Sequence, residues 1–182
     1  MPDPWEAVDG RANWEAPPST FLSLLQTHAQ LDELFLLHQE ALLAFDIPLA
    51  IERLHEFEHR LLIHMCQEED LLLPVYQRAG SIPGGTIILF TGEHQKMREL
   101  RGRFQEILGR LASEPPGLRR EIIRLLDYQT MFKHLVEHHN LRERNILYPT
   151  LDKVTGEEER RELLGQCLTE LEHQTAAPCR RI

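Results

Sequence analysis

Apolar residues recur at intervals of three and four along four long segments of the chain, which is the spacing of amphipathic helices. The first segment begins at Ser19 or Thr20, and its apolar stripe consists of Phe21, Leu24, Leu31, Phe35 and Leu42. The second follows Ile47-Pro48 and reaches about Tyr76. The third runs from about Ile87 to about Ser113, and the fourth from about Leu118 to Leu147.

Breaks rich in glycine and proline separate these segments, and no stretch shows the alternation of a strand. Tyr148-Pro149 is expected to end the fourth helix, and residues 156–173 predict a shorter fifth one. Because short connections favour antiparallel neighbours, we expect an all-α fold, an up-down-up-down four-helix bundle over residues 19–150. Residues 1–18 would form an irregular N-terminal arm, and residues 151–182 a C-terminal helix and tail.

Polar residues interrupt the apolar stripes in a repeated pattern. Residues 57–74 resemble residues 132–149, and the identical pairs are Phe57/Phe132, His59/His134, His64/His139, Glu68/Glu143, Leu72/Leu147 and Pro74/Pro149. In each copy a His-x-x-x-Glu pair places an imidazole and a carboxylate one turn apart on one helix face. His28 and His94 lie on the stripes of the first and third helices.

An antiparallel bundle brings these residues to one level. His28 and His94 lie about two turns into their helices, and the His-x-x-x-Glu pairs lie a comparable distance before the ends of theirs. Buried carboxylates require a counter-charge, which a cation supplies. We therefore predict a metal centre whose ligands are His28, His64, Glu68, His94, His139 and Glu143.

Imidazole and carboxylate ligands suit iron, manganese or zinc, whereas a thiolate zinc site is not indicated, because the three cysteines lack a Cys-x-x-Cys spacing. Each glutamate could bridge two ions while two histidines cap each ion. Two terminal protein ligands per ion would leave positions free for a small molecule, so the site is expected to be reactive.

These motifs resemble the hemerythrin-like family, also called the HHE cation-binding domain, over residues 20–150. The resemblance rests on His28, on His-x-x-x-Glu-Glu with Leu-x-Pro from His64 to Pro74, on Glu93-His94, and on His-x-x-x-Glu with Leu-x-Pro from His139 to Pro149. It implies a non-heme centre of two iron ions, oxo- or hydroxo-bridged, with both glutamates bridging.

The chain departs from the oxygen carriers of that family at two points. They have a histidine four residues after the third-helix histidine, where this chain has Arg98, and they have an aspartate five residues after a fourth-helix histidine, where His139 is followed by Glu143 at four. Both differences argue against simple oxygen transport. The pattern is closer to the version with four histidines and two glutamates, similar to the iron–sulfur cluster repair di-iron proteins.

The remaining histidines are weaker candidates. His138 is an alternative ligand, although a surface or supporting position is favoured because it points off the stripe. His59 and His134 face outward, His55 lies off the stripe, and His38, roughly 15 Å beyond His28, is expected at the far end of the bundle. Glu69 and Glu93 are candidates for orienting imidazoles, although solvated helix faces often contain such residues.

Composition excludes some partners. The net charge of −9 and the pI near 5.6 oppose binding to nucleic acid. The sequence has no apolar run of about 18 residues and no signal-peptide pattern, so we expect no membrane contact and a cytoplasmic location.

Two functions remain open from the sequence. The first is a di-iron protein that handles oxygen, nitric oxide, peroxide or iron itself, for sensing, stress protection or iron donation. The alternative is a helical regulatory or interaction module in which the metal is structural or absent. Whether the chain is an enzyme or a homodimer is left undecided.

Overall fold

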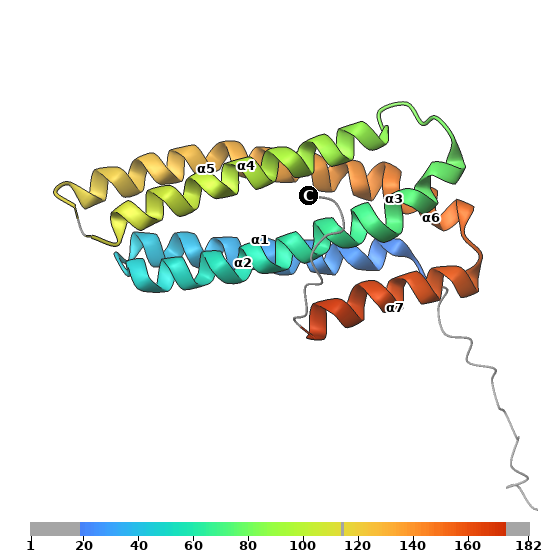
Figure 1. Ribbon diagram of the computed structural model, residues 1–182, viewed down its shortest axis with the longest axis horizontal. Helices are drawn as coiled ribbons and strands as arrows, with labels where there is room; N and C mark the ends of the chain where they lie inside the picture. The colour runs from blue at the N-terminus through green and yellow to red at the C-terminus, as the bar shows by residue number, and fades with distance from the viewer. Residues whose placement is uncertain (1–18, 114, 174–182) are drawn as a thin grey trace, which may run out of the picture.

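The computed structural model describes residues 19–113 and 115–173, with backbone only for 169–173. All regular elements in this part of the chain are helices (Figure 1). The predicted arm over residues 1–18 lies outside the described residues, as does the tail over 174–182. The all-α prediction is confirmed.

Four long helical rods form the bundle. The first consists of the 3-10 turn η1 (Phe21–Leu24) and α1 (Leu25–Leu43); the second of α2 (Ile47–Gln67), the π-helix η2 (Glu68–Leu72), α3 (Leu73–Tyr76) and the 3-10 turn η3 (Gln77–Ala79). The third is α4 (Ile87–Leu111); the fourth consists of α5 (Leu118–Arg142), the π-helix η4 (Glu143–Leu147) and α6 (Tyr148–Val154). A separate helix, α7 (Glu157–His173), follows.

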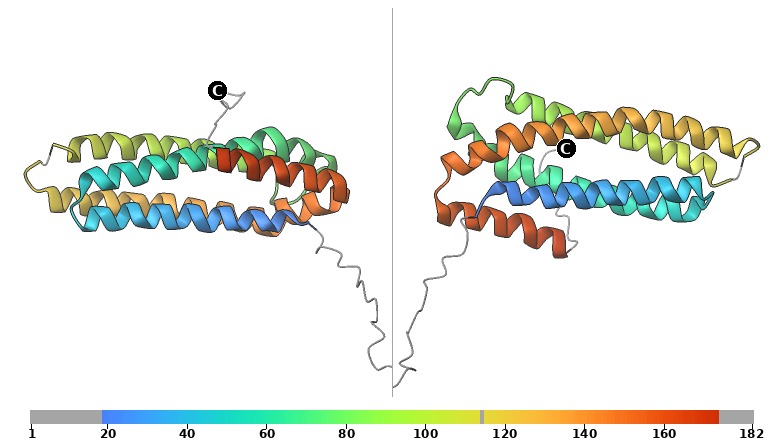
Figure 2. Two further views of the ribbon diagram at one scale, coloured as in Figure 1. Left: turned by 90° about the horizontal axis from the view of Figure 1, so that it is seen from below. Right: turned by 180° about the vertical axis from the view of Figure 1, so that it is seen from behind.

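The rods run alternately up and down, and the α1–α2 hairpin packs against the α4–α5 hairpin (Figures 1 and 2). Local sequence explains where the rods begin. Thr20 caps η1 by accepting a hydrogen bond from the Leu22 amide, and Asp46 caps α2 by accepting one from the Leu49 amide. The alternating direction of the rods confirms the predicted up-down-up-down bundle.

The fourth rod is longer than predicted. Pro149 does not end it but occupies the first turn of α6, directly after the π-helix η4, so its missing N–H falls where the helical hydrogen-bond pattern changes. Asp152 on α6 accepts hydrogen bonds from the Thr20 hydroxyl at 2.6 Å and the Phe21 amide at 3.0 Å. The predicted end at Tyr148-Pro149 is wrong, and the proposed domain boundary after residue 150 falls inside a helix that binds the start of the first rod.

Helix α7 lies along α2 outside the four-rod bundle (Figure 2). Its Leu164 and Cys167 are buried against the bundle, and the Gln67 side chain donates to the Cys167 carbonyl at 2.8 Å. In the described part of the chain, none of the helices combines the length and the apolarity needed to cross a lipid bilayer.

The core consists of two apolar clusters. The aromatic core contains Phe35, Phe57, Phe104 and Phe132, with ring centroids 4.9 Å apart for Phe35 and Phe57 and 5.3 Å for Phe35 and Phe132. The second cluster, near η2 and η4, is built around Leu72, Phe90, Leu147 and Tyr148. The predicted ligands belong to neither cluster, although they are buried in the same bundle.

Candidate metal centre

All six predicted ligands lie together in the bundle interior. His28 comes from α1, His64 and Glu68 from the second rod, His94 from α4, and His139 and Glu143 from the fourth rod. Each is at most 5% exposed. The common level expected from the antiparallel topology is therefore what the structure shows, although metal ligation by these residues stays a prediction.

The six residues form two overlapping groups of four. The first subsite contains His28 and His64, the second contains His94 and His139, and both include Glu68 and Glu143. Within each group one ligand atom of every residue lies within 4.8 Å of the others. The arrangement offers two adjacent cation positions with shared carboxylates.

Each pair of imidazoles points its Nε2 atoms inward. The Nε2 atoms of His28 and His64 are 3.0 Å apart, and those of His94 and His139 are also 3.0 Å apart. Two neutral imidazoles cannot both use these lone pairs on each other, but a cation between them accepts both. The inward nitrogens are thus arranged as ligand pairs.

The two carboxylates each present one oxygen to each subsite. Glu68 Oε1 is 3.5 Å from His64 Nε2, and its Oε2 is 3.2 Å from His94 Nε2. Glu143 Oε2 is 3.1 Å from His28 Nε2, and its Oε1 is 2.6 Å from His139 Nε2. This is the disposition that bridging carboxylates require.

Both bridging candidates begin a π-helical turn. The wide turns are closed by hydrogen bonds from the Leu73 amide to the Glu68 carbonyl and from the Tyr148 amide to the Glu143 carbonyl, five residues apart. In each copy a proline follows six residues after the glutamate. Because proline cannot donate to the carbonyl four residues before it, the repeated Leu-x-Pro explains why the helix widens here.

The imidazoles and carboxylates of the cluster shift one another's pKa values. Burial alone would lower the pKa of His139, but the neighbouring carboxylates of Glu143, Glu68 and Glu93 hold this pKa well above its ordinary value. Burial dominates at His64 and lowers its pKa. Burial opposes ionisation of Glu68, yet the surrounding imidazoles hold its pKa well below the usual range. The Glu68 carboxylate is therefore stable as an anion because imidazoles that can carry positive charge lie beside it.

The outward nitrogens of the second subsite are anchored. Glu69 lies 2.8 Å from His94 Nδ1, and Glu93 lies 2.9 Å from His139 Nδ1. Arg98 donates to Glu69 at 3.0 Å, and Arg142 donates to Glu93. The orienting roles considered for Glu69 and Glu93 agree with this geometry, because such partners fix the ring and leave Nε2 free for a metal.

The first subsite is supported differently. His28 Nδ1 is buried and has no hydrogen-bond partner among the described residues. Tyr148 is fully buried, donates to Glu68 Oε1 at 3.0 Å and lies 3.2 Å from His28 Nε2. The sequence indicates Tyr148 only as a helix end. Its position five residues after Glu143 does not by itself predict the contacts with Glu68 and His28.

The surroundings of the buried carboxylate oxygens show whether the site fits a metal ion. Glu68 Oε2 and both carboxylate oxygens of Glu143 are buried and accept no hydrogen bond of good geometry in the described part of the chain, although imidazole Nε2 atoms lie 2.6, 3.1 and 3.2 Å from them. Buried carboxylate oxygens without donors are strongly unfavourable. Cations held by these oxygens and the four Nε2 atoms would remove that cost, so the residues present fit a pair of metal ions.

The other histidines whose side chains the structure describes lie elsewhere. His55, His59, His134 and His138 are exposed, so the surface interpretation of His59 and His134 agrees with the structure, and the alternative of His138 as a ligand does not. His38 is fully buried at the aromatic end, as expected, where its Nδ1 lies 2.7 Å from the Ala50 carbonyl and its Nε2 lies 2.8 Å from the Gln129 amide nitrogen.

Comparison with known proteins agrees with this geometry. Residues 22–151 match the family model of the hemerythrin HHE cation-binding domain. No match is found among curated proteins, and none among solved structures. The matched range includes nearly all of the four rods and all six clustered residues. The chain therefore belongs to the hemerythrin HHE cation-binding family.

Proposed function

We propose that the chain is a non-heme di-iron protein that binds a small molecule, namely oxygen, nitric oxide or peroxide, or that stores and donates iron. The observation that carries the proposal is the pair of buried carboxylates that each direct one oxygen to each subsite. Manganese and zinc have the same ligand preferences and are the competing metals.

The residues of the chain have distinct tasks in this function. His28 and His64 would hold one ion, His94 and His139 would hold the other, and Glu68 and Glu143 would be shared by both. Iron in such a site supplies a Lewis acid with open positions for a small ligand. The carboxylates of Glu69 and Glu93 keep the imidazoles of the second subsite oriented.

Metal analysis tests the proposal directly. Protein purified with supplied iron should contain about two irons per chain and show a near-ultraviolet charge-transfer band of bridged ferric iron. Less than one metal per chain would overturn the proposal. If ions bind, no oxygen, nitric oxide or peroxide alters the spectrum and the iron is not given up to an external chelator, the metal is structural and the chain is a helical regulatory or interaction module.

The bridging role has its own test. Glu68→Gln with Glu143→Gln keeps the side-chain volume but weakens both shared ligands, so stoichiometric iron should be lost. Glu58→Gln is the matched control, because Glu58, like Glu68, is a buried glutamate of the second rod but lies outside both groups of four. Retention of two irons in the double variant would contradict the proposed bridges.

A further inference from the structure

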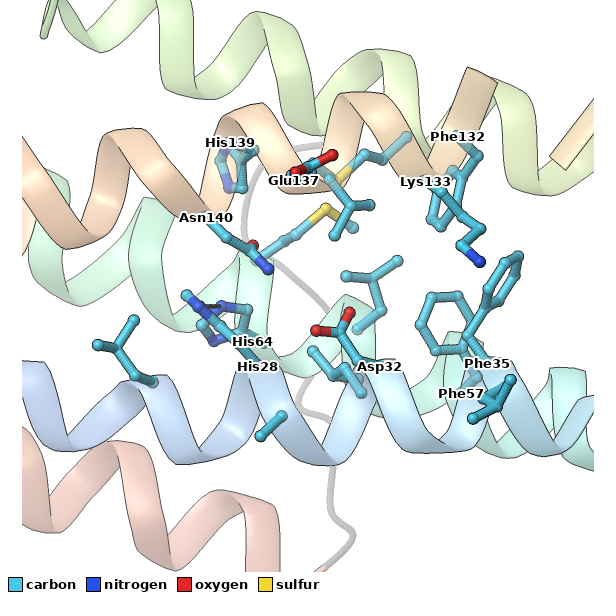
Figure 3. A pocket seen from close by; sticks show the side chains of 18 of the residues that line it. His28, Asp32, Phe35, Phe57, His64, Phe132, Lys133, Glu137, His139 and Asn140 are labelled. Atoms are coloured by element: carbon cyan, nitrogen blue, oxygen red, sulfur yellow. Dashed lines mark hydrogen bonds between the residues drawn. The ribbon is translucent and has the colours of Figure 1, made fainter. Parts of the chain in front are cut away.

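A cavity of about 610 Å³ lies between α1 and α5 and opens onto the metal centre (Figure 3). Its lining includes His28 and His64 of the first subsite and His139 of the second. Exposed residues of both helices, Asp32 and Lys133 among them, also line it, so it is open to solvent. A molecule that enters here can reach the ligand cluster.

The volume exceeds what a diatomic molecule needs. A water molecule, similar in size to oxygen or nitric oxide, takes up about 30 Å³ in the liquid. Small organic ligands occupy pockets of roughly 300–1,000 Å³. The cavity therefore falls in the size class of organic ligands.

The lining changes in character along its length. Figure 3 shows His28, His64, His139 and Asn140 at one end and Phe35, Phe57 and Phe132 at the other, where Lys133 lies beside the aromatic rings. Further apolar lining comes from Leu31, Leu61, Met65, Met97 and Val136. A ligand that fits this lining has one polar end and an apolar body.

The metal centre determines the chemistry of the polar end. Ions held by imidazoles and carboxylates bind oxygen donors. At the rim, Asp32 and Glu137 offset the positive charge of Lys133 and Arg144, so the entrance does not select a highly charged anion such as a polyphosphate. The polar end should therefore be small and oxygen-bearing, as in a carboxylate or a hydroperoxide.

We infer that this cavity binds a medium-chain aliphatic molecule whose single oxygen-bearing end meets the first subsite and whose hydrocarbon chain lies against the aromatic core. The inference deepens the proposed di-iron function and rests on it for the polar end. Binding of the hydrocarbon chain does not require the metal, because only protein side chains form the apolar wall.

Calorimetric titration with acetate, hexanoate, octanoate and decanoate tests the inference on protein whose iron content has been measured. Each two-carbon extension should tighten binding several-fold, up to about fifteenfold when both methylenes are fully buried. The same dependence on chain length should appear in metal-free protein at weaker affinity. Octyl hydroperoxide, titrated beside octanoate against iron-loaded protein, distinguishes a hydroperoxide end from a carboxylate end.

Val136→Phe narrows the cavity and should weaken decanoate at least tenfold while leaving acetate binding and iron content unchanged. Ile123→Phe is the matched control, because Ile123 lies on the same helix, is 58% exposed and does not line the cavity. Ala29→Phe, at an exposed lining position on α1, should have the same effect as Val136→Phe without disturbing the core.

The outcomes separate this inference from the function on which it rests. Loss of iron binding with retained chain-length dependence would overturn the proposed function and leave the apolar cavity established. Two irons per chain with equal affinity for acetate and decanoate would overturn the inference alone. If decanoate does not bind and Val136→Phe abolishes a concentration-dependent dimer in sedimentation, the groove is covered by a second copy of the chain instead.

Discussion

His28 and His38 are both buried in the same helix, ten residues apart, yet their surroundings differ completely. Both ring nitrogens of His38 have protein partners, the Ala50 carbonyl and the Gln129 side chain. His28 instead directs its Nε2 toward His64 Nε2 and Glu143. The comparison teaches that burial of a histidine does not identify a ligand. Convergence of several inward nitrogens on two buried carboxylates does.

The same contrast holds for buried glutamates. Glu58 is 3% exposed, and its neighbours are Gln105 at 2.5 Å and Arg101 at 3.9 Å. Burial raises the pKa of Glu58 to about 7, so a proton can neutralise it. Four imidazoles surround Glu68 and Glu143, and there positive charge keeps the carboxyl group of Glu68 ionised. A single buried acid takes up a proton, whereas a pair among imidazoles is suited to cations.

The largest expected effect comes from removing the metal. Binding at about a thousandfold excess over Kd stabilises a protein by about 4 kcal/mol. After chelation, amide hydrogen exchange should accelerate most in η2, α3, η4 and α6, while amides near the aromatic core should stay protected. Equal acceleration around His28 and around His38 would show that the two regions do not differ in their dependence on metal.

Loss of an orienting carboxylate should have the next largest effect. Glu93→Gln leaves His139 Nδ1 with a neutral partner, so iron affinity at the second subsite should fall about 10- to 100-fold. Competition with a chelator of known affinity measures the change. Glu99→Gln, at an exposed position of the same helix, should have no effect on metal affinity. Equal losses in the two variants would refute the anchoring role.

At the aromatic end, Gln129→Leu should lower stability without affecting the metal. The substitution leaves His38 Nε2 buried and unpaired, which costs about 2 kcal/mol. Urea denaturation measures the loss, and iron content should remain at the wild-type value. Gln26→Leu, on an exposed face of α1, is the control and should change stability little. Iron loss on mutation of Gln129 would mean that the two regions are coupled.

The smallest predicted effect is the pH dependence set by Glu58. Because its folded pKa of about 7 lies above the unfolded value near 4.5, its contribution to stability is complete below pH 4.5 and is lost as the pH rises through 7. The expected loss is on the order of 1 kcal/mol. Urea denaturation at several pH values should show a shallower pH dependence for Glu58→Gln. If the pH dependence of stability is unchanged in Glu58→Gln, Glu58 is not its origin.

The two subsites also differ from each other. The imidazoles of the second subsite have the carboxylate partners Glu69 and Glu93, whereas His28 Nδ1 has none among the described residues, and the cavity opens onto the first subsite. Stepwise iron titration should therefore fill the second subsite first. Arg98 takes part in this difference by donating to Glu69, at the position where the oxygen carriers have a histidine.

The sequence by itself determined the all-α bundle and identified the six clustered residues as candidate ligands. The helical period placed His28, His64, His94 and His139 on inward faces, and antiparallel connection brought them to one level. The repeat indicated Glu68 and Glu143 as equivalent partners. These features follow from local periodicity and chain direction, which a linear pattern records.

Only the tertiary structure decided the contacts between rods. Tyr148 reaches Glu68 across 80 positions of sequence, Gln129 reaches His38 across 91, and Asp152 reaches Thr20 across 132. Such pairings depend on how helices rotate and pack against each other, which local pattern does not specify. The cavity between α1 and α5 is likewise a result of packing, because its lining residues come from four helices that meet only in the folded chain.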